Sequence, residues 1–366
     1  MSLERLDVRG VRNLESQSLR DLAAVNVFYG VNGSGKTSLL EAVHLLGLAR
    51  SFRTAHIKSV ITHGETSCTV YGEVRKSGSV LPVGVQRERD GRLDARVGGT
   101  GIRTRAELAQ VLPLQVIHTD SFKIISGGPT ERRQFLDWGV FHVEHQFLTA
   151  WQQYQKAIKQ RNSLLRRGKI SPDLLRPWDE QMAVAGERID SSRATYMGQL
   201  EPAFQRCLDE LTPRMGSLEL RYRRGWDKNA SLLEALSQSE AADQQQGFTH
   251  VGPQRADIRM LIDGKPAAEN LSRGQMKVVV CALKLAQGEL MRVQGSVPCI
   301  YLVDDLTAEL DIEHCRKVAE MLDRMEVQQF VTCIQRKDVE SVWQLDEQRD
   351  LAMFHVEHGA LNRLAV

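Results

Sequence analysis

The chain has 366 residues, with 48 Lys and Arg against 46 Asp and Glu, and 42% of its residues are hydrophobic. This composition is typical of a globular protein and disfavours disorder, collagen and membrane spans. The net charge of +2 does not by itself indicate a nucleic-acid partner, since steering depends on where the charge lies. The charged N-terminus lacks the apolar core of a signal peptide, and the six cysteines form no C-x-x-C pair, so we expect a cytoplasmic protein.

The first third of the chain is expected to form short strands around one helix. Runs of alternating apolar residues predict strands over 3–8, 25–29, 67–74 and 80–86. A helix is expected over 36–49, directly after a glycine-rich loop.

From about residue 131 to residue 239 the apolar spacing becomes helical, with few strand signals. Helices are expected over 151–166 and 178–211, and Pro202 should kink or split the second. Strands return at 297–303 and 330–334, where continuous apolar runs suit parallel strands covered on both faces.

This change of character predicts a split domain organisation. Residues 1–118 and 248–366 are expected to build one α/β head, and residues 119–247 a mainly helical arm inserted between them.

The clearest motif is a glycine-rich loop that matches G-x-x-x-x-G-K-[ST], between the predicted strand 25–29 and the predicted helix 36–49. Its glycines let backbone N–H groups surround a phosphate at the helix N-terminus. Lys36 then reaches the β- and γ-oxygens, and the Thr37 hydroxyl ligates Mg²⁺. The predicted nucleotide-binding residues are Gly30, Val31, Asn32, Gly33, Ser34, Gly35, Lys36, Thr37 and the adjacent Ser38.

A second apolar strand, over 301–303, ends in two carboxylates, Asp304 and Asp305. Next to a phosphate loop, one such carboxylate can hold Mg²⁺ and the other can orient the attacking water. We therefore assign Asp304, with Thr37, to the metal, and Asp305, with Lys36, to catalysis. Taken alone, the pair also fits a solvated strand end or a helix cap.

A third motif is Leu271-Ser272-Arg273-Gly274-Gln275, followed by a strongly helical run over 276–291. Ser272 stands where a helix N-cap is expected, but Ser and Gly at a helix N-terminus also make an anion site. One chain cannot easily place two phosphate sites on one ATP, so the motif predicts a second protomer. Its residues Ser272, Arg273, Gly274 and Gln275 would act in trans.

In this order the three motifs resemble the head of ABC-type ATPases, in which the LSxGQ signature of one protomer closes over the nucleotide of the other. The segment 307–311 resembles the family's D-loop and ends at Asp311. Ser272 lies 235 positions after Thr37, farther than in transporter subunits and far nearer than in SMC-type proteins with long coiled coils. The implied fold class is an α/β, ABC/SMC-type P-loop ATPase head with a short helical arm.

A short-armed head of this kind is similar, over nearly the whole chain, to the RecF family of bacterial DNA replication and repair proteins. Beyond the nucleotide motifs, the resemblance rests on Arg12-Asn13, Ser51-Phe52-Arg53, residues 127–137 and residues 251–257. It places Arg12 and Asn13 in the nucleotide site.

The chain departs from the family pattern at several positions. Gln254 stands where the family usually has His, and no clear Q-loop glutamine follows near 119–120. Thr332 stands where transporters have a switch histidine, and Asp305 where they have Glu. The shorter carboxylate would suit slow turnover, as in a switch.

The small net charge averages over an uneven distribution. Residues 150–172 carry a local charge of +6 with no acidic residue, beside Trp151 and Tyr154. Such a stripe can neutralise DNA phosphates, or it can be a solvated helix face. The candidate DNA-binding residues are Lys156, Lys159, Arg161, Arg166, Arg167 and Lys169, with Arg53 or Lys58 on the head. A second patch, Arg221, Arg223 and Arg224, is too short to assign.

The resemblance implies an ATP-dependent DNA-binding protein with a weak DNA-dependent ATPase activity. ATP would join two protomers into a clamp on gapped or single-strand/double-strand junction DNA, and slow hydrolysis would release it. RecO- and RecR-type partners, loading of RecA and a role in the SOS response are implied by the resemblance alone. The alternatives are a transporter's nucleotide-binding subunit, which the motif spacing disfavours, and a DNA-binding scaffold with little ATPase activity, which the intact motifs disfavour.

Overall fold

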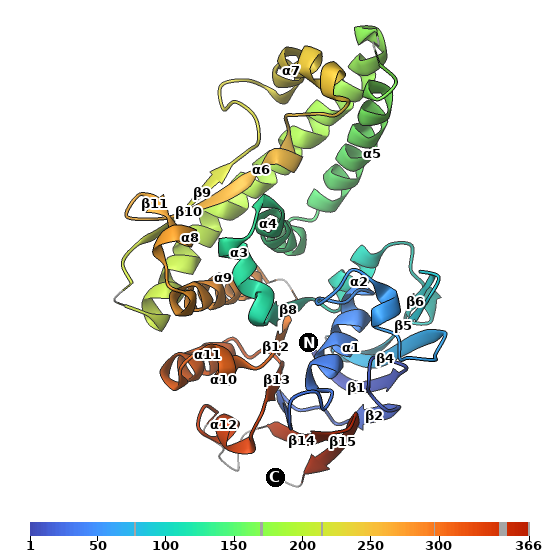
Figure 1. Cartoon of the computed structure of the whole chain (residues 1–366), viewed down its shortest axis with the longest axis vertical. Coiled ribbons are helices and arrows are strands. Elements are labelled where there is room, and N and C mark those ends of the chain that lie inside the picture. Colours follow the sequence, from blue (N-terminus) through green and yellow to red (C-terminus); the bar gives the residue numbers. More distant parts are fainter. Residues whose placement is uncertain (77, 169–170, 214, 296, 344–349, 365–366) are drawn as a thin grey trace. The chain divides into compact units, whose positions relative to one another are not determined.

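The structure is a computed structural model that describes the chain except residues 77, 169–170, 214, 296, 344–349 and 365–366. Its internal contacts divide the chain into a first unit, residues 1–121 with 277–366, and a second unit, residues 122–276. Both ends of the chain therefore build one unit, and the middle builds the other (Figure 1). Residues 248–276, which we expected in the head, group with the second unit.

The first unit contains most of the strands. Its elements are β1 (Ser2–Arg9), β2 (Gln17–Arg20), β3 (Val25–Tyr29), α1 (Lys36–Leu48), η1 (Ile57–Ser59), β4 (Ser67–Lys76), β5 (Ser79–Glu88), β6 (Leu93–Val97), β7 (Thr100–Gly101), α2 (Arg105–Val111), β8 (Leu114–Ile117), β12 (Ile300–Val303), α10 (Leu306–Glu309), α11 (Ile312–Arg324), β13 (Gln329–Cys333), α12 (Arg336–Glu340), β14 (Leu351–Glu357) and β15 (Ala360–Leu364). Two elements run across the boundary between the units, η2 (Thr119–Phe122) and α9 (Arg273–Val293).

Two six-stranded sheets form the first unit. One is antiparallel, in the order β2-β1-β4-β5-β6-β7. The other has the order β15-β14-β3-β13-β12-β8 and is parallel except for the β14–β15 hairpin. Because β3 and β12 are parallel and only β13 separates them, their carboxyl ends lie at the same edge of this sheet.

Helix α1 connects the two sheets through an apolar core. Its residues Leu39, Leu40, Val43 and Leu46 are fully buried, and it contacts β4, β5 and β13. Each buried side chain of this size contributes about 1.5–3 kcal/mol relative to exposure. Because α1 is buried on nearly all sides, the position of its first residue, Lys36, is fixed relative to the sheet edge.

The second unit is mainly helical. Its elements are α3 (Lys123–Ser126), α4 (Pro129–Val143), α5 (Phe147–Leu165), α6 (Pro172–Leu211), β9 (Leu218–Arg223), α7 (Leu232–Gln246), η3 (Pro253–Arg255), β10 (Asp257–Ile262), β11 (Lys265–Pro266) and α8 (Ala267–Asn270). Helices α5 and α7 pack along the long α6, and the small sheet has the order β11-β10-β9 (Figure 1).

Most expected elements are confirmed with small shifts at their ends. The strand expected over 297–303 begins only at Ile300, after Pro298, which lacks the N–H that a ladder needs. Pro202 does not split α6, which runs unbroken through it. Strand β9 lies in the stretch that we expected to be helical.

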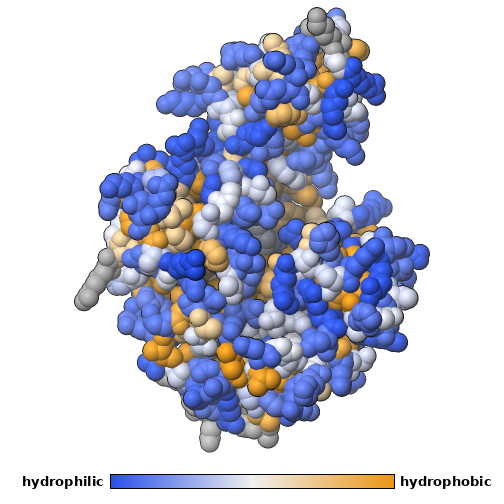
Figure 2. Space-filling view, in the orientation of Figure 1, coloured by the Kyte–Doolittle hydropathy of each residue, from blue (hydrophilic) through white to orange (hydrophobic). Residues whose placement is uncertain are grey.

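Figure 2 shows one face of the molecule coloured by residue hydropathy. The face shown is mostly hydrophilic over both units, with apolar residues in small separate groups. In the part of the chain that the structure describes, no helix is both long and apolar enough to cross a membrane.

Candidate functional site

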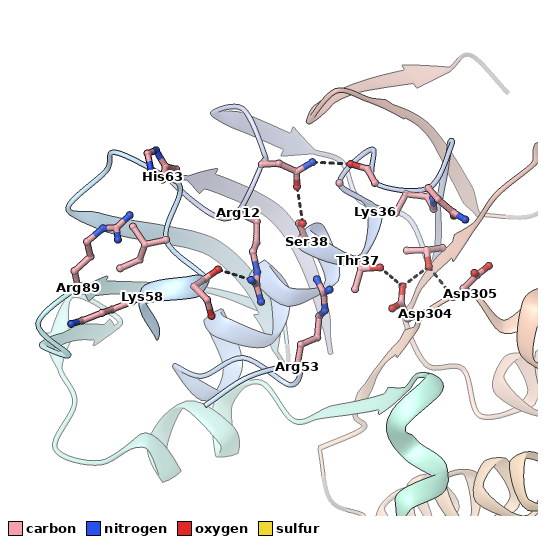
Figure 3. A pocket seen from close by; sticks show the side chains of 17 residues that line it. Arg12, Lys36, Thr37, Ser38, Arg53, Lys58, His63, Arg89, Asp304 and Asp305 are labelled. Carbon is pink, nitrogen blue, oxygen red and sulfur yellow. Dashed lines mark hydrogen bonds between the residues drawn. The ribbon is translucent and has the colours of Figure 1, made fainter. Parts of the chain in front are cut away.

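A pocket of about 690 Å³ lies in the first unit, where the ends of β3 and β12 meet (Figure 3). It extends from Lys36 at one end to Lys58, His63 and Arg89 at the other. Its lining residues are Arg12, Asn13, Asn32, Gly33, Gly35, Lys36, Thr37, Ser38, Arg53, Lys58, Ser59, Ile61, His63, Arg89, Asp304, Asp305 and Thr332.

The glycine-rich loop runs from β3 to α1 as the motif predicts. Gly30 has a positive φ of 156°, and a Cβ added there would lie 2.2 Å from the carbonyl oxygen of Val356, so only glycine fits. The Lys36 ammonium donates to the carbonyl oxygens of Gly30 (2.7 Å) and Val31 (3.0 Å). Burial lowers the pKa of Lys36, while Asp305 and Asp304 oppose that shift. The lysine therefore stands inside the loop, at the level where a bound phosphate would lie.

Thr37 and Asp304, the predicted metal ligands, are in direct contact. The hydroxyls of Thr37 (2.9 Å) and Thr332 (2.8 Å) both donate to Oδ1 of Asp304. Burial raises the pKa of Asp304, and these two hydrogen bonds partly offset the shift. Hydroxyl and carboxylate oxygens are ligands that Mg²⁺ prefers, and a buried carboxylate gains most from a nearby cation. This donor set fits Mg²⁺.

Asp305 is held in an unusual backbone conformation at the start of α10. Its φ of 53° lies in the left-handed region, which costs free energy and is concentrated at functional sites. Its N–H donates to the hydroxyl of Thr332 (2.9 Å). Its Oδ1 is buried and has no hydrogen-bond partner among the described residues. Burial, and then the charge of Asp304, raise its pKa. Asp305 thus lines the pocket with an acceptor oxygen that no described residue uses.

Asn13 hydrogen-bonds to the glycine-rich loop and to the start of α1. Its amide nitrogen donates to the carbonyl oxygen of Gly33 (3.0 Å), and its amide oxygen accepts from the hydroxyl of Ser38 (2.9 Å). The structure thus brings Asn13 together with Ser38, which Figure 3 labels among the side chains of the pocket.

Arg12 and Arg53 are anchored by one buried carboxylate. Glu41 of α1 is 0% exposed and accepts from Nε and Nη2 of Arg12, both at 2.9 Å. It also accepts from the Ser51 hydroxyl and lies 3.7 Å from Arg53 Nη1. Arg53 and Lys58, which we considered for DNA binding, both line this pocket.

The D-loop and signature residues do not line this pocket. Asp311 caps α11 by accepting from the backbone N–H of His314 (3.0 Å). Ser272 to Gln275 belong to the second unit and are exposed. Ser272 accepts from the Gln275 N–H (3.2 Å), and its own N–H donates to the Gln275 side chain (2.8 Å). This reciprocal cap matches the N-cap expected of Ser272.

The basic segment 156–169, which begins in α5 and continues past its end, divides into exposed and buried residues. Lys156, Lys159, Arg166 and Arg167 are exposed, so their contact with DNA stays a prediction, whereas Lys169 lies outside the described residues. The prediction that Arg161 contacts DNA is wrong.

The Arg161 side chain is 0% exposed, with its Nε 2.5 Å from Asp179 and its Nη1 2.6 Å from Asp243. It joins α5 to the helices that carry Asp179 and Asp243, and it offers no exposed charge for a DNA phosphate. Tyr154 is likewise buried, and Trp151 stacks against it and Phe147.

Sequence reasoning missed Glu41, His63 and Arg89 and gave Thr332 no role. Glu41 had a visible signal, since it is the single acidic residue in the apolar run of α1. Thr332 had one too, since it stands where transporters have a switch histidine. His63 and Arg89 lacked one, because their position depends on strand pairing and loop packing.

A strand, phosphate loop and helix beside two carboxylates on a parallel strand define a P-loop nucleotide-binding head. The model of the RecF/RecN/SMC N-terminal domain family matches residues 2–360. The DNA replication and repair proteins RecF of Pseudomonas aeruginosa (strain LESB58) and Pseudomonas putida (strain GB-1) are each 48% identical over 364 residues, covering 99% of this chain and 98% of each relative. The chain therefore belongs to the RecF/RecN/SMC family and, within it, to the RecF proteins.

Solved structures agree with this fold. A structure of the recombination mediator protein RecF with ATP, in the RecFOR pathway, matches with a TM-score of 0.88 and 27% identity, covering 99% of this chain and 97% of that one. An Smc head bound to the C-terminal winged-helix domain of ScpA matches with a TM-score of 0.59 at 16% identity, a likeness of fold alone.

Proposed function

We propose that the chain is an ATP-dependent DNA-binding protein in DNA replication and recombinational repair, acting in the cytoplasm. The observation that carries this proposal is the meeting of Lys36, Thr37, Asp304 and Asp305 at one end of a pocket in the first unit. ATP in the similar RecF structure supports the choice of nucleotide.

Each residue has a distinct chemical role. Lys36 exchanges the loop carbonyls for β- and γ-phosphate oxygens, and backbone N–H groups at the start of α1 bind the same phosphates. Thr37 and Asp304 hold Mg²⁺, which supplies charge neutralisation at the phosphates. Asp305 orients the attacking water and accepts its proton. One short carboxylate, without a switch histidine, suits slow hydrolysis.

A second copy completes the site. Ser272, Arg273, Gly274 and Gln275 are exposed at a helix N-terminus, the geometry that binds an anion, and Asp311 is exposed at the start of α11. ATP bound to one protomer would be capped by Ser272 and Gly274 of the other. Since ATP has higher affinity for the dimer, binding drives closure and hydrolysis reverses it.

The dimer would clamp DNA. Lys156, Lys159, Arg166 and Arg167 offer exposed charge for phosphates, and gapped or single-strand/double-strand junction DNA is the proposed substrate. By its family, the chain would act with RecO- and RecR-type proteins to load RecA, and in the SOS response.

Sedimentation of the chain with and without Mg·ATP tests this proposal. We expect a monomer without nucleotide and a dimer with it, and ATP-dependent, salt-sensitive binding of gapped duplex DNA. A monomer that ignores both ATP and DNA at low salt would contradict the proposal.

A substitution in the signature tests the role in trans. We expect Ser272→Arg to keep ATP binding, because the residue does not line the pocket of its own protomer, and to abolish ATP-induced dimers. Ser237→Arg, at an exposed serine of α7, is the matched control and should dimerise normally. Dimers that persist in Ser272→Arg would show that the signature does not cap the nucleotide.

A further inference from the structure

A second pocket, of about 950 Å³, lies wholly within the second unit. It is formed by the start of α4, the middle of α6, the segment that leaves β9, and the start of β10. Its lining residues are Pro129, Asp190, Ala194, Tyr222, Arg223, Arg224, Gly225, Trp226, Asp227, Lys228, Asn229, Arg255 and Asp257.

One wall of this pocket is built by a close approach of two backbone segments. Gly225 has a φ of 97°, and a Cβ added there would lie 2.3 Å from the carbonyl oxygen of Gly252. The N–H of Gly252 donates to the carbonyl oxygen of Gly225 (3.2 Å). The segment over 251–257, to which the nucleotide pocket gives no role, thus shapes this second pocket.

Two of the three carboxylates in the lining are engaged by cations. Asp190 accepts from the Tyr222 hydroxyl (2.9 Å) and pairs with Arg224 (3.0 Å). Asp257 accepts from Nε (2.7 Å) and Nη2 (3.1 Å) of Arg132.

The third carboxylate, Asp227, accepts from the N–H of Asn229 (2.8 Å), which shapes the turn. Two acids of the lining are therefore already neutralised by partners.

Three cations of the lining have no such partner. Arg223, Lys228 and Arg255 are exposed, and none of them forms an ion pair within the described part of the chain. Arg221 and Arg224, their neighbours in sequence, are instead paired with Glu219 and Glu187. The pocket lining therefore carries positive charge, unpaired among the described residues, on Arg223, Lys228 and Arg255.

Trp226, which lines the pocket, carries a hydrogen-bond donor without an acceptor in the described part of the chain. The Arg224 guanidinium lies over the Trp226 ring, 3.9 Å from its centroid, and fixes the indole. The indole Nε1 is buried and has no partner among the described residues. An unpaired buried donor is unfavourable, so an acceptor that reached it would recover free energy.

We propose that this pocket binds a phosphate group, carried by a DNA strand or by a free nucleoside phosphate. Guanidinium groups of Arg223 and Arg255 match phosphate oxygens in geometry, and Trp226, whose indole N–H has no acceptor among the described residues, lines the same pocket. The volume is within the range of pockets that take nucleotide-sized ligands. The DNA form of this inference rests on the proposed function, and the free-nucleotide form does not.

Binding is measured without Mg·ATP, using inorganic phosphate, thymidine monophosphate and single-stranded oligothymidine as probes. Tryptophan fluorescence should change in the parent chain, and that change should be missing in Trp226→Phe, which keeps a ring under Arg224 but removes the donor. A response limited to the oligonucleotide assigns a DNA strand, and a response to all three probes assigns free phosphate compounds.

Affinity for the probe that responds is then compared between variants. We expect Arg223→Ala with Arg255→Ala to bind about tenfold more weakly and, for the oligonucleotide, to reduce the salt slope by about 0.7 for each phosphate that is no longer neutralised. Arg221→Ala is the matched control, because Arg221 is on the same strand but is paired with Glu219 and does not line the pocket. It should bind as the parent does.

Two results would overturn the inference: no probe changes the fluorescence assigned to Trp226, or the double variant binds as tightly as Arg221→Ala. The ATP-dependent sedimentation assay is run on the same proteins. A Trp226 response without ATP-induced dimers would support this inference and contradict the proposed function. ATP-induced dimers without a Trp226 response would support the proposed function and contradict this inference.

Discussion

A single hydroxyl organises both carboxylates of the nucleotide site. Thr332 accepts from the backbone of Asp305 and donates to the side chain of Asp304, so one side chain orients both acids. A histidine, which transporter-type heads have at this position, cannot make the same two bonds from one atom. The site therefore differs from those heads in how its acids are oriented, as well as in the shorter carboxylate.

Asp305 is the residue on which hydrolysis should depend most. We expect Asp305→Asn to bind ATP as the parent does but to hydrolyse it about 10²–10⁴-fold more slowly, the range for loss of a general base. Single-turnover hydrolysis measures this effect. Asp304→Asn is the comparison, because it should weaken the Mg²⁺ dependence of binding as well. Unchanged hydrolysis in Asp305→Asn would refute the assigned role.

His44 should make the stability of the first unit depend on pH. Burial lowers the pKa of His44 to about 3 from the ordinary 6.5, although its Nδ1 donates to the Arg50 carbonyl oxygen (2.6 Å). Between these values the unfolded chain binds a proton that the folded chain does not. The free energy of unfolding therefore falls as pH is lowered from 6.5 toward 3, by up to about 1.4 kcal/mol per pH unit.

The measurement compares urea unfolding of the parent chain and of His44→Asn from pH 7 to pH 5. Asparagine keeps a donor toward the Arg50 carbonyl oxygen but does not titrate. We expect the difference in unfolding free energy between the two proteins to shrink as pH falls. A constant difference would mean that His44 does not titrate in this window.

At the scale of elements, the side chain of Arg161 links helix α5 to helices α6 and α7. Arg161 reaches Asp179 on α6 and Asp243 on α7, and its Nη1 also lies 2.9 Å from the Thr249 hydroxyl. Removing one partner of a buried ion pair leaves uncompensated charge, which costs about 3–5 kcal/mol.

We therefore expect Arg161→Ala to lower the free energy of unfolding by about that amount, with Lys159→Ala within about 0.5 kcal/mol of the parent because its side chain is exposed. Urea unfolding followed by circular dichroism measures both. A loss of DNA affinity in folded Arg161→Ala, without a loss of stability, would favour the original assignment.

What the sequence predicts well is local. The phosphate loop, α1 and the strands β3 and β12 follow from motif spacing and apolar runs of a few residues. The assignment of Arg161 to DNA binding was wrong because its partners, Asp179 and Asp243, lie 18 and 82 positions away, where no sequence pattern indicates them. The split that was one expected effect of Pro202 does not occur: its side chain is exposed, and packing of α5 and α7 along α6 outweighs one missing hydrogen bond.

On the scale of the whole molecule, the exposed positive charge on α5 and just after it should set the salt dependence of DNA binding. In the variant with Lys156, Lys159, Arg166 and Arg167 all changed to Ala, the slope of log affinity against log salt should fall by up to about 0.9 for each phosphate that these side chains neutralise. Gapped duplex DNA with Mg·ATP is the substrate. Arg176→Ala is the control, because Arg176 pairs with Glu180. An unchanged slope would place DNA elsewhere.

The division into units was only partly visible in the sequence. The insertion of a helical segment follows from the change in periodicity, but its end does not, because residues 248–276 carry strand and turn signals like those of the first unit. Their grouping depends on β10 pairing with β9 and on Arg132 pairing with Asp257.

The central place of β3 has a consequence for synthesis of the chain. Asn26 and Gln329, neighbours in the sheet, are 303 positions apart, and β3 pairs with β13 and β14 on its two sides. At roughly 5–20 residues per second, β3 leaves the ribosome about 15–60 s before either partner exists. For the later part of that time all residues of the second unit have been synthesised, while β3 still has no partner strand at either edge. Nascent chains should therefore need protection from aggregation at β3, and the phosphate loop can take its final form only after β13 and β14 arrive.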